Sequence, residues 1–184
     1  MIYCLDTEFL EGTQKKLFGK TKPTIDLISI GIVDENGREF YAISNEFNLK
    51  EAWNRWEQRT GQGDRNNHPP REYWIRENVL KPIWLEYIGG IHKAHFFSFT
   101  YRNMKKILKQ NGMSNIEIAN SICAFIYGDD CGGSGMSAIE MAMKYEISDK
   151  SKEPVFYGYF ASYDWTVFCW LFGKMINLPN GFPK

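Results

Sequence analysis

Apolar and polar residues alternate over residues 2–9 (IYCLDTEF), which is the period-two pattern typical of a β-strand. Residues 26–44 (DLISIGIVDENGREFYAIS) hold two more β-rich stretches, and Asn36-Gly37 between them indicates a tight hairpin turn. We therefore predict three opening strands that neighbour one another in antiparallel order. The polar and basic residues 11–24, between the first two strands, predict a long surface loop.

Beyond residue 46 the apolar spacing becomes helical. Ser114 with Glu117 three positions later forms a capping-box pattern, and Gly112 and Gly128 are typical helix-ending residues. The Gly, Asn and Pro residues of 60–72 predict a linker-like loop. The predicted helices cover residues 49–59, 73–90 with a break at Pro82, 99–111, 114–128 and 134–148.

The C-terminal part returns to a strand followed by a helix. Residues 155–160 (VFYGYF) predict the strand, and residues 165–176 are apolar almost all round, which predicts a buried helix. Asp164 falls in the first turn of this helix, where the helix dipole favours a negative charge.

Composition limits the class of protein. A chain of 184 residues with 43% apolar content is long enough for a single domain with a real core, so we expect one domain over residues 1–184. No apolar run is long enough for a membrane span, and residues 1–6 lack signal-peptide features, so we expect a cytoplasmic protein with no membrane partner and four reduced cysteines. The formal net charge is zero, so a polyanionic partner requires a local basic patch or bound metal.

Asp6 and Glu8 raise a chemical question, because side chains two positions apart on a strand share a face and two adjacent carboxylates repel each other. One interpretation is a solvated strand face, with Asp164 as a helix-capping acid. The other is that all three acids hold Mg²⁺ or Mn²⁺, which prefer carboxylate oxygens. Two such ions about 3.5–4 Å apart activate water and stabilise the leaving oxygen of a phosphodiester.

Three segments resemble the ribonuclease AS type of 3′–5′ exoribonuclease, within the DEDD exonuclease group that includes ribonuclease T and oligoribonuclease. They are YCLDTEFLE, IDLISIGIVDENGREFYAIS and FYGYFASYDWTVFCWLFGKMINLP. The resemblance covers residues 1–50 and 153–183, with ENVLKPIW as a further short match. Residues 88–150 have no counterpart, and we interpret them as a helical insertion.

The resemblance implies an α/β fold of the ribonuclease H-like kind, with a mixed central sheet flanked by helices. It implies hydrolysis of single-stranded RNA from a free 3′ end with two divalent ions. It assigns Asp6, Glu8 and Asp164 as catalytic metal ligands. Positions equivalent to Thr7, Phe9 and Leu10 meet the terminal nucleotide in similar enzymes, although plain core packing would also explain Phe9 and Leu10.

The chain departs from the family pattern in one respect. The family has a His followed five residues later by an Asp, which supply a general base and a further metal ligand, and none of the three histidines here has that spacing. The sequence is therefore compatible with a C-terminally short chain that lacks the last family helix, or with a natural shortened form. A homodimer that covers the resulting apolar surface is a further expectation from the resemblance.

Two alternatives use the same residues. The first is a catalytically weak or inactive nucleic-acid-binding module, in which the basic segments 15–22 and 101–110 contact phosphates, although each segment could equally be a solvated face. The second is a DNA 3′–5′ exonuclease, which the acids alone do not distinguish from a ribonuclease.

Overall fold

The structure is a computed structural model that describes residues 1–14, 18–58, 71–128, 137, 139–140, 153–159, 161–173 and 177–183. By its internal contacts the chain divides into two compact units. Unit 1 comprises residues 1–11, 25–47 and 112–184, and unit 2 comprises residues 12–24 and 48–111. Each unit is described separately below.

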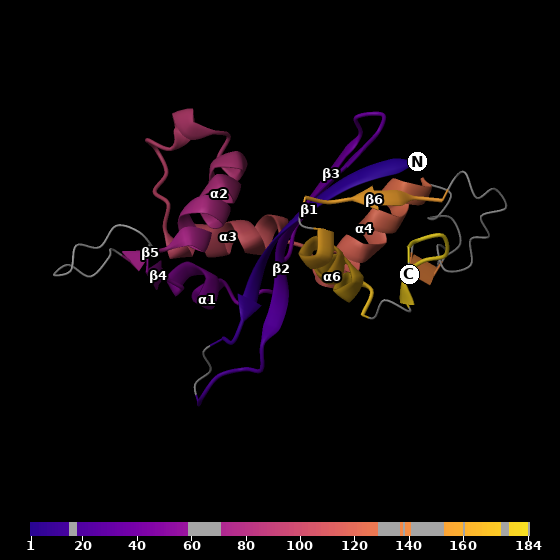
Figure 1. Ribbon diagram of the computed structural model, residues 1–184. Coiled ribbons are helices and arrows are strands. Elements are labelled where there is room, and N and C mark those ends of the chain that lie inside the picture. Colours follow the sequence, from indigo (N-terminus) through magenta and orange to yellow (C-terminus); the bar gives the residue numbers. More distant parts are fainter. Residues whose placement is uncertain are drawn as a thin grey trace. The chain divides into compact units, whose positions relative to one another are not determined.

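A mixed sheet with the strand order β3-β2-β1-β6 is the framework of unit 1 (Figure 1). β2 and β3 pair antiparallel from Ser29 with Ile43 to Val33 with Glu39. β6 pairs parallel with β1. The strands are β1 Ile2–Gly12, β2 Thr24–Asp34, β3 Glu39–Ile43 and β6 Val155–Tyr157.

Hydrogen bonds at both ends of β1 and β2 show that these neighbours run in opposite directions. The Glu35 N–H donates to the Ile2 carbonyl oxygen at 3.0 Å, where β2 ends and β1 begins. The Thr24 hydroxyl donates to the Gly12 carbonyl oxygen at 3.5 Å, where β2 begins and β1 ends. The three predicted antiparallel strands are therefore confirmed.

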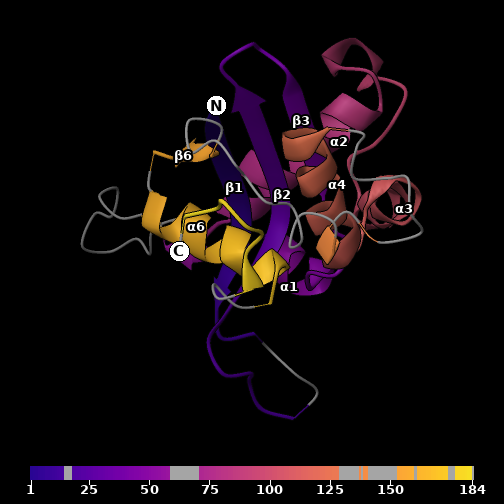
Figure 2. The same cartoon turned by 90° about the vertical axis from the view of Figure 1, so that its right-hand side faces the viewer.

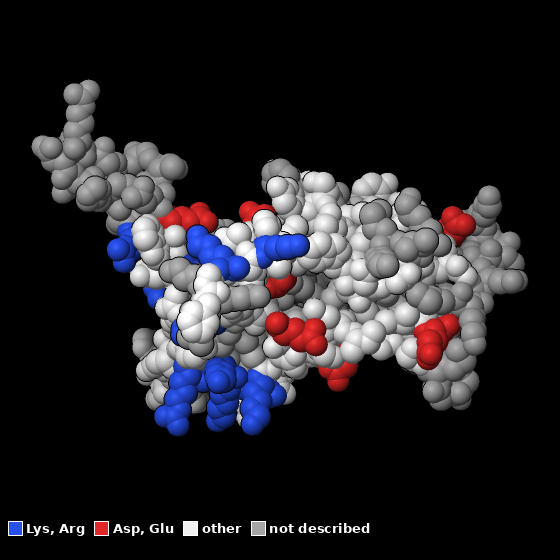
Figure 3. Space-filling model, turned by 90° about the horizontal axis from the view of Figure 1, so that it is seen from below, with Lys and Arg blue, Asp and Glu red and all other residues white. Residues whose placement is uncertain are grey.

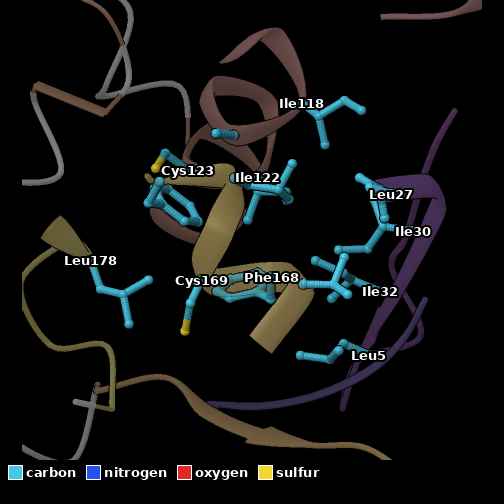
Figure 4. Close-up of a cluster of buried hydrophobic side chains, with 14 of the residues drawn as sticks. Leu5, Leu27, Ile30, Ile32, Ile118, Ile122, Cys123, Phe168, Cys169 and Leu178 are labelled. Carbon is cyan, nitrogen blue, oxygen red and sulfur yellow. The ribbon is translucent and has the colours of Figure 1, made fainter. Parts of the chain in front are cut away.

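Helices α4 (Asn115–Tyr127) and α6 (Ala161–Leu171) pack against each other and share one apolar core with the sheet (Figure 2). Figure 4 shows Leu5 and the β2 side chains Ile30 and Ile32 on one side of this core, with Phe168 of α6 among them. Burial of these side chains supplies the main stabilisation of unit 1. The same core fixes where α6 begins relative to β1.

Unit 2 is built around aromatic side chains. Trp53 of α1 lies 4.8 Å from Phe99 between ring centroids, and Phe99 lies 5.4 Å from Trp84 of α2. The elements are α1 Leu49–Asn54, β4 Glu57–Gln58, β5 Arg71–Glu72, a π-helical turn Arg76–Leu80, α2 Lys81–Tyr87, a short 3-10 turn Ile91–Lys93 and α3 Tyr101–Asn111.

The predicted elements are present within the described residues, but several bounds differ. β6 ends at Tyr157 although a strand was predicted over 155–160, and α6 covers Ala161–Leu171 although the helix was predicted over 165–176. α4 has the expected capping box, in which Ser114 and Glu117 bond to each other's backbone N–H groups, and it ends at Gly128. The helix predicted over 49–59 ends at Asn54 and gives way to β4. The helix predicted over 134–148 and the 60–72 loop lie mainly outside the described residues.

The expected α/β class is therefore present, as a mixed sheet with helices. The stretch 88–150 is shared between the units, because α3 belongs to unit 2 whereas α4 contributes to the core of unit 1. The assignment of residues 1–184 to a single exonuclease-like domain stays a prediction. Within the described part of the chain, no helix combines the length and the apolar character needed to cross a membrane.

Candidate functional site

β1 presents the first two predicted site residues, Asp6 and Glu8. Tyr3, Leu5 and Thr7 are buried on one face of the strand, so Asp6 falls on the other face, where it is exposed. Glu8 is half-buried. The alternation of a regular strand therefore brings the two carboxylates out of the core, as the period-two pattern predicted.

α6 supplies the third acid from a point far along the chain. Asp164 lies in the first turn of α6, and only 6% of its surface is exposed. Its Oδ1 accepts a hydrogen bond from the Thr7 backbone N–H at 3.0 Å and another from the Thr7 hydroxyl at 2.7 Å. These two bonds hold Asp164 against β1 at the residue between Asp6 and Glu8. Asp6 and Asp164 line the same pocket, whereas Glu8 is not among the lining residues.

A pocket of about 430 Å³ opens at this point. The Phe9 and Tyr163 rings in its wall are stacked, with centroids 5.8 Å apart and planes within 10° of parallel. The pocket is lined by Asp6, Thr7, Phe9, Glu11, Tyr159, Tyr163 and Asp164. The site thus combines carboxylates with a flat aromatic surface, and such a surface suits an unpaired base.

A second pocket, of about 350 Å³, shares Asp164 with the first. Its other lining residues include the rings of Phe156 and Trp165 together with Leu5, and among the described lining residues Asp164 alone carries a formal charge. One carboxylate in an apolar wall is a poor site for a divalent cation, so the first pocket is the better candidate for chemistry.

The carboxylates on β1 are in an unfavourable electrostatic environment. Burial raises the pKa of Asp6, and the negative charge of Asp164 raises it further. Burial likewise raises the pKa of Glu8, and Asp6 and then Asp164 add to the shift. No Lys or Arg among the described residues forms an ion pair with any of the three acids. A bound cation would relieve this repulsion.

The donor atoms fit Mg²⁺ or Mn²⁺ in kind, since all three are carboxylates. Their spacing is looser than that of a closed ligand cluster: within the described ranges, no three His, Cys, Asp or Glu side chains converge closely enough to hold one ion together. Oδ1 of Asp164 is engaged by Thr7, so Oδ2 is the atom of this carboxylate left to contact a cation.

The residues expected to meet the substrate differ in their placement. Phe9 is half-buried and lines the pocket, whereas Leu10 is fully buried, as the core-packing alternative expected. Thr7 is buried and its hydroxyl is used to hold Asp164. His92 and His95 are exposed on unit 2, and His68 lies outside the described residues.

Glu11, Tyr159 and Tyr163 line the pocket although the sequence did not predict them as site residues. Tyr163 directly precedes Asp164 and could have been suspected from that position alone. The bond between Thr7 and Asp164 joins residues 157 positions apart, and no local pattern in the sequence reports it.

Fold and site together define an α/β protein with a carboxylate-lined pocket beside a pair of stacked rings. One stretch of the chain is similar to known 3′–5′ exoribonucleases. A 52-residue segment is 48% identical to 3′–5′ exoribonuclease Rv2179c of Mycobacterium tuberculosis strain ATCC 25618 / H37Rv, and equally to 3′–5′ exoribonuclease MT2234.1 of strain CDC 1551 / Oshkosh. The segment covers 28% of this chain and 26% of each relative's length. No family model matches the chain.

Proposed function

We propose that the chain is a metal-dependent 3′–5′ exoribonuclease, of the ribonuclease AS type and with a ribonuclease H-like fold. Three observations support the proposal: the mixed sheet order, the mutual electrostatic influence of Asp6, Glu8 and Asp164, and the similarity of a segment to proteins named 3′–5′ exoribonuclease. The single observation that carries it is the pair of hydrogen bonds from Thr7 to Oδ1 of Asp164, because they bring an acid from α6 to the acidic strand β1.

In this proposal Asp6, Glu8 and Asp164 hold two Mg²⁺ or Mn²⁺ ions. The ions would supply a water-derived nucleophile at neutral pH and stabilise the leaving oxygen of the terminal phosphodiester. Phe9 and Tyr163 offer their rings to the base of the 3′-terminal nucleotide, and Thr7 positions Asp164 without touching the substrate.

The test is digestion of a single-stranded RNA labelled at its 5′ end, with Mn²⁺ present. We expect a ladder of products that shorten one nucleotide at a time from the 3′ end. Asp6→Asn should lower the rate by about a thousandfold or more, since it removes a cation ligand. Glu35→Gln, an exposed acid in the β2–β3 turn, is the matched control and should leave the ladder unchanged. Equal rates for wild type and Asp6→Asn would refute the metal assignment.

A second candidate function is a nucleic-acid-binding module on the same fold that cuts weakly or not at all. The exposed cationic residues of α3 (Tyr101–Asn111) favour it, because Lys and Arg side chains bind phosphates whether or not the chain cuts. RNA binding without a ladder, under conditions in which Mn²⁺ binds, would select this alternative.

The choice between RNA and DNA rests on the 2′-hydroxyl. We expect an RNA oligomer to be shortened faster than a DNA oligomer of the same base sequence. Faster shortening of the DNA strand would instead identify a DNA exonuclease that uses the same acids.

A further inference from the structure

The net charge of the chain is zero, but the two units carry large charges of opposite sign. Unit 2 contains sixteen of the 22 Lys and Arg residues and six of the 22 Asp and Glu residues, so its formal charge is +10. Unit 1 contains the remaining six cationic and sixteen acidic residues, so its formal charge is −10. The positive field that the whole-chain sum appeared to exclude is therefore present on one unit.

Helix α3 concentrates part of this charge on one face. Its four cationic residues follow the spacing i, i+3, i+4 and i+7, which places them on the same side of a helix. Figure 3 shows a row of Lys and Arg side chains over the part of the molecule that contains α1, α2 and α3. The exposed cationic residues of α3 are Arg102, Lys105, Lys106 and Lys109. The buried residues of the opposite face are Met104, Ile107 and Leu108.

These cations have no acidic neighbours in their own helix, because α3 contains neither Asp nor Glu. None of the ion pairs recorded among the described residues includes a residue of α3. Arg102 and Lys106 are four positions apart, as are Lys105 and Lys109, and like charges at that spacing repel each other. Such a face is stabilised when it meets an anion.

Exposed aromatic rings stand just before this face. Phe96 is 83% exposed and Phe97 is 51% exposed. Ser98, which follows these two rings in the sequence, is bonded to α3, because the Asn103 side chain donates to the Ser98 carbonyl oxygen at 2.8 Å. Cationic side chains combined with exposed rings are the combination that binds single-stranded nucleic acid, because phosphates meet the cations and bases stack on the rings.

We infer that unit 2 binds single-stranded RNA along the cationic face of α3, with Phe96 and Phe97 as stacking surfaces for bases. The inference rests on the proposed function, and it assigns the binding of single-stranded RNA to unit 2. Affinity on such a face comes mainly from the release of counterions from phosphates, so it depends steeply on salt.

The test measures binding of a fluorescent single-stranded RNA of about 20 nucleotides by anisotropy, with EDTA present so that no cutting occurs. Lys105→Gln/Lys109→Gln is compared with the matched control Lys50→Gln/Lys81→Gln, which removes two exposed cations of unit 2 outside α3. We expect the α3 variant to bind about tenfold more weakly at ~0.1 M salt. The slope of log affinity against log salt should become less steep by about 1.4, because two phosphate contacts are lost. Phe96→Ala should weaken binding without changing that slope.

Equal affinities for wild type and the α3 variant would overturn the inference, as would equal losses in the two double variants. Binding of polyglutamate in place of RNA would also overturn it and would indicate a protein partner. Because EDTA removes divalent ions, this result is independent of catalysis. A failure of the proposed function would appear separately, as the absence of an RNA ladder in the presence of Mn²⁺.

Discussion

Asp164 depends on one residue of β1 for its position. The backbone N–H and the hydroxyl of Thr7 both donate to Oδ1 of Asp164, and both residues are 6% exposed. A buried carboxylate is costly unless hydrogen bonds satisfy it. Thr7 therefore has a structural task that neither of its acidic neighbours performs.

Substitution of Thr7 tests that task. Thr7→Val keeps the shape and the backbone donor but removes the hydroxyl, so we expect the free energy of unfolding to fall by about 1–3 kcal/mol. Thr7→Ser keeps the hydroxyl, so its free energy of unfolding should fall by less than that of Thr7→Val. Urea unfolding followed by circular dichroism measures both values. A Thr7→Val protein as stable as wild type would show that the bond to Asp164 contributes nothing.

At the scale of elements, the β2–β3 turn is held by a buried acid. Asp34 is 4% exposed and accepts bonds from the Arg38 and Asn36 N–H groups, each at 2.9 Å, and from the Arg38 side chain at 2.6 Å. Burial alone would raise the pKa of Asp34, but the bonds from Arg38 and Asn36 outweigh it and lower the pKa overall. Gly37 completes the turn with φ +78°, a conformation that glycine adopts without strain.

Because Asp34 holds this turn, the free energy of unfolding depends on pH. Because the pKa of Asp34 is lower in the folded state, its contribution is present above the unfolded value of about 3.9 and is lost as pH falls through the folded value. We expect Asp34→Asn to be less stable than wild type at pH 7, with the difference shrinking below about pH 4. Urea midpoints measured across this range test it, with Glu35→Gln as the control. A constant difference at all pH values would contradict the assignment.

The N-terminus of α4 is stabilised by local hydrogen bonds between a cap residue and the first helical turn. Ser114 and Glu117 form a capping box, with the Ser114 N–H donating to Glu117 at 2.7 Å. Ser114→Ala removes the side-chain cap and should lower the free energy of unfolding by about 1 kcal/mol. Ser98→Ala, at an exposed serine outside any helix, is the control. A cap variant that unfolds at the same urea concentration as this control would contradict the prediction.

The elements that sequence predicted best are those with local signals of this kind. Asn36-Gly37 identified the turn, and Ser114 with Gly128 identified both ends of α4. The early end of α1 at Asn54 was not predictable, because the β4–β5 pairing that follows it depends on residues distant in sequence.

At the scale of the whole molecule, the charge division has a consequence for chromatography. A chain with a sequence pI of about 6.8 would ordinarily bind weakly to any charged resin at pH 7. With units of +10 and −10, we expect retention on both heparin and an anion exchanger at low salt. Lys105→Gln/Lys109→Gln should elute earlier from heparin only. Passage of the wild type through both columns without retention would contradict the expectation.

Much of the candidate site was predictable because the positions of its acids follow from local sequence patterns. The shared face of Asp6 and Glu8 follows from strand periodicity, and the place of Asp164 follows from the start of α6. The support from Thr7 and the ring pair of Phe9 with Tyr163 was not predictable, since both arise from contacts between distant segments. The charge of unit 2 was missed because a sum over the whole chain cancels it.

In the proposed function Asp6, Glu8 and Asp164 together hold divalent cations, and calorimetric titration of the full chain with Mn²⁺ measures this binding. Asp164→Asn is the informative variant, because its amide oxygen can still accept both bonds from Thr7 while the negative charge is gone. We expect two ions to bind per wild-type chain. We expect Asp164→Asn to bind Mn²⁺ at least tenfold more weakly while its thermal unfolding temperature stays the same. Binding of Mn²⁺ with the same affinity to wild type and Asp164→Asn, or no binding to wild type at all, would contradict it.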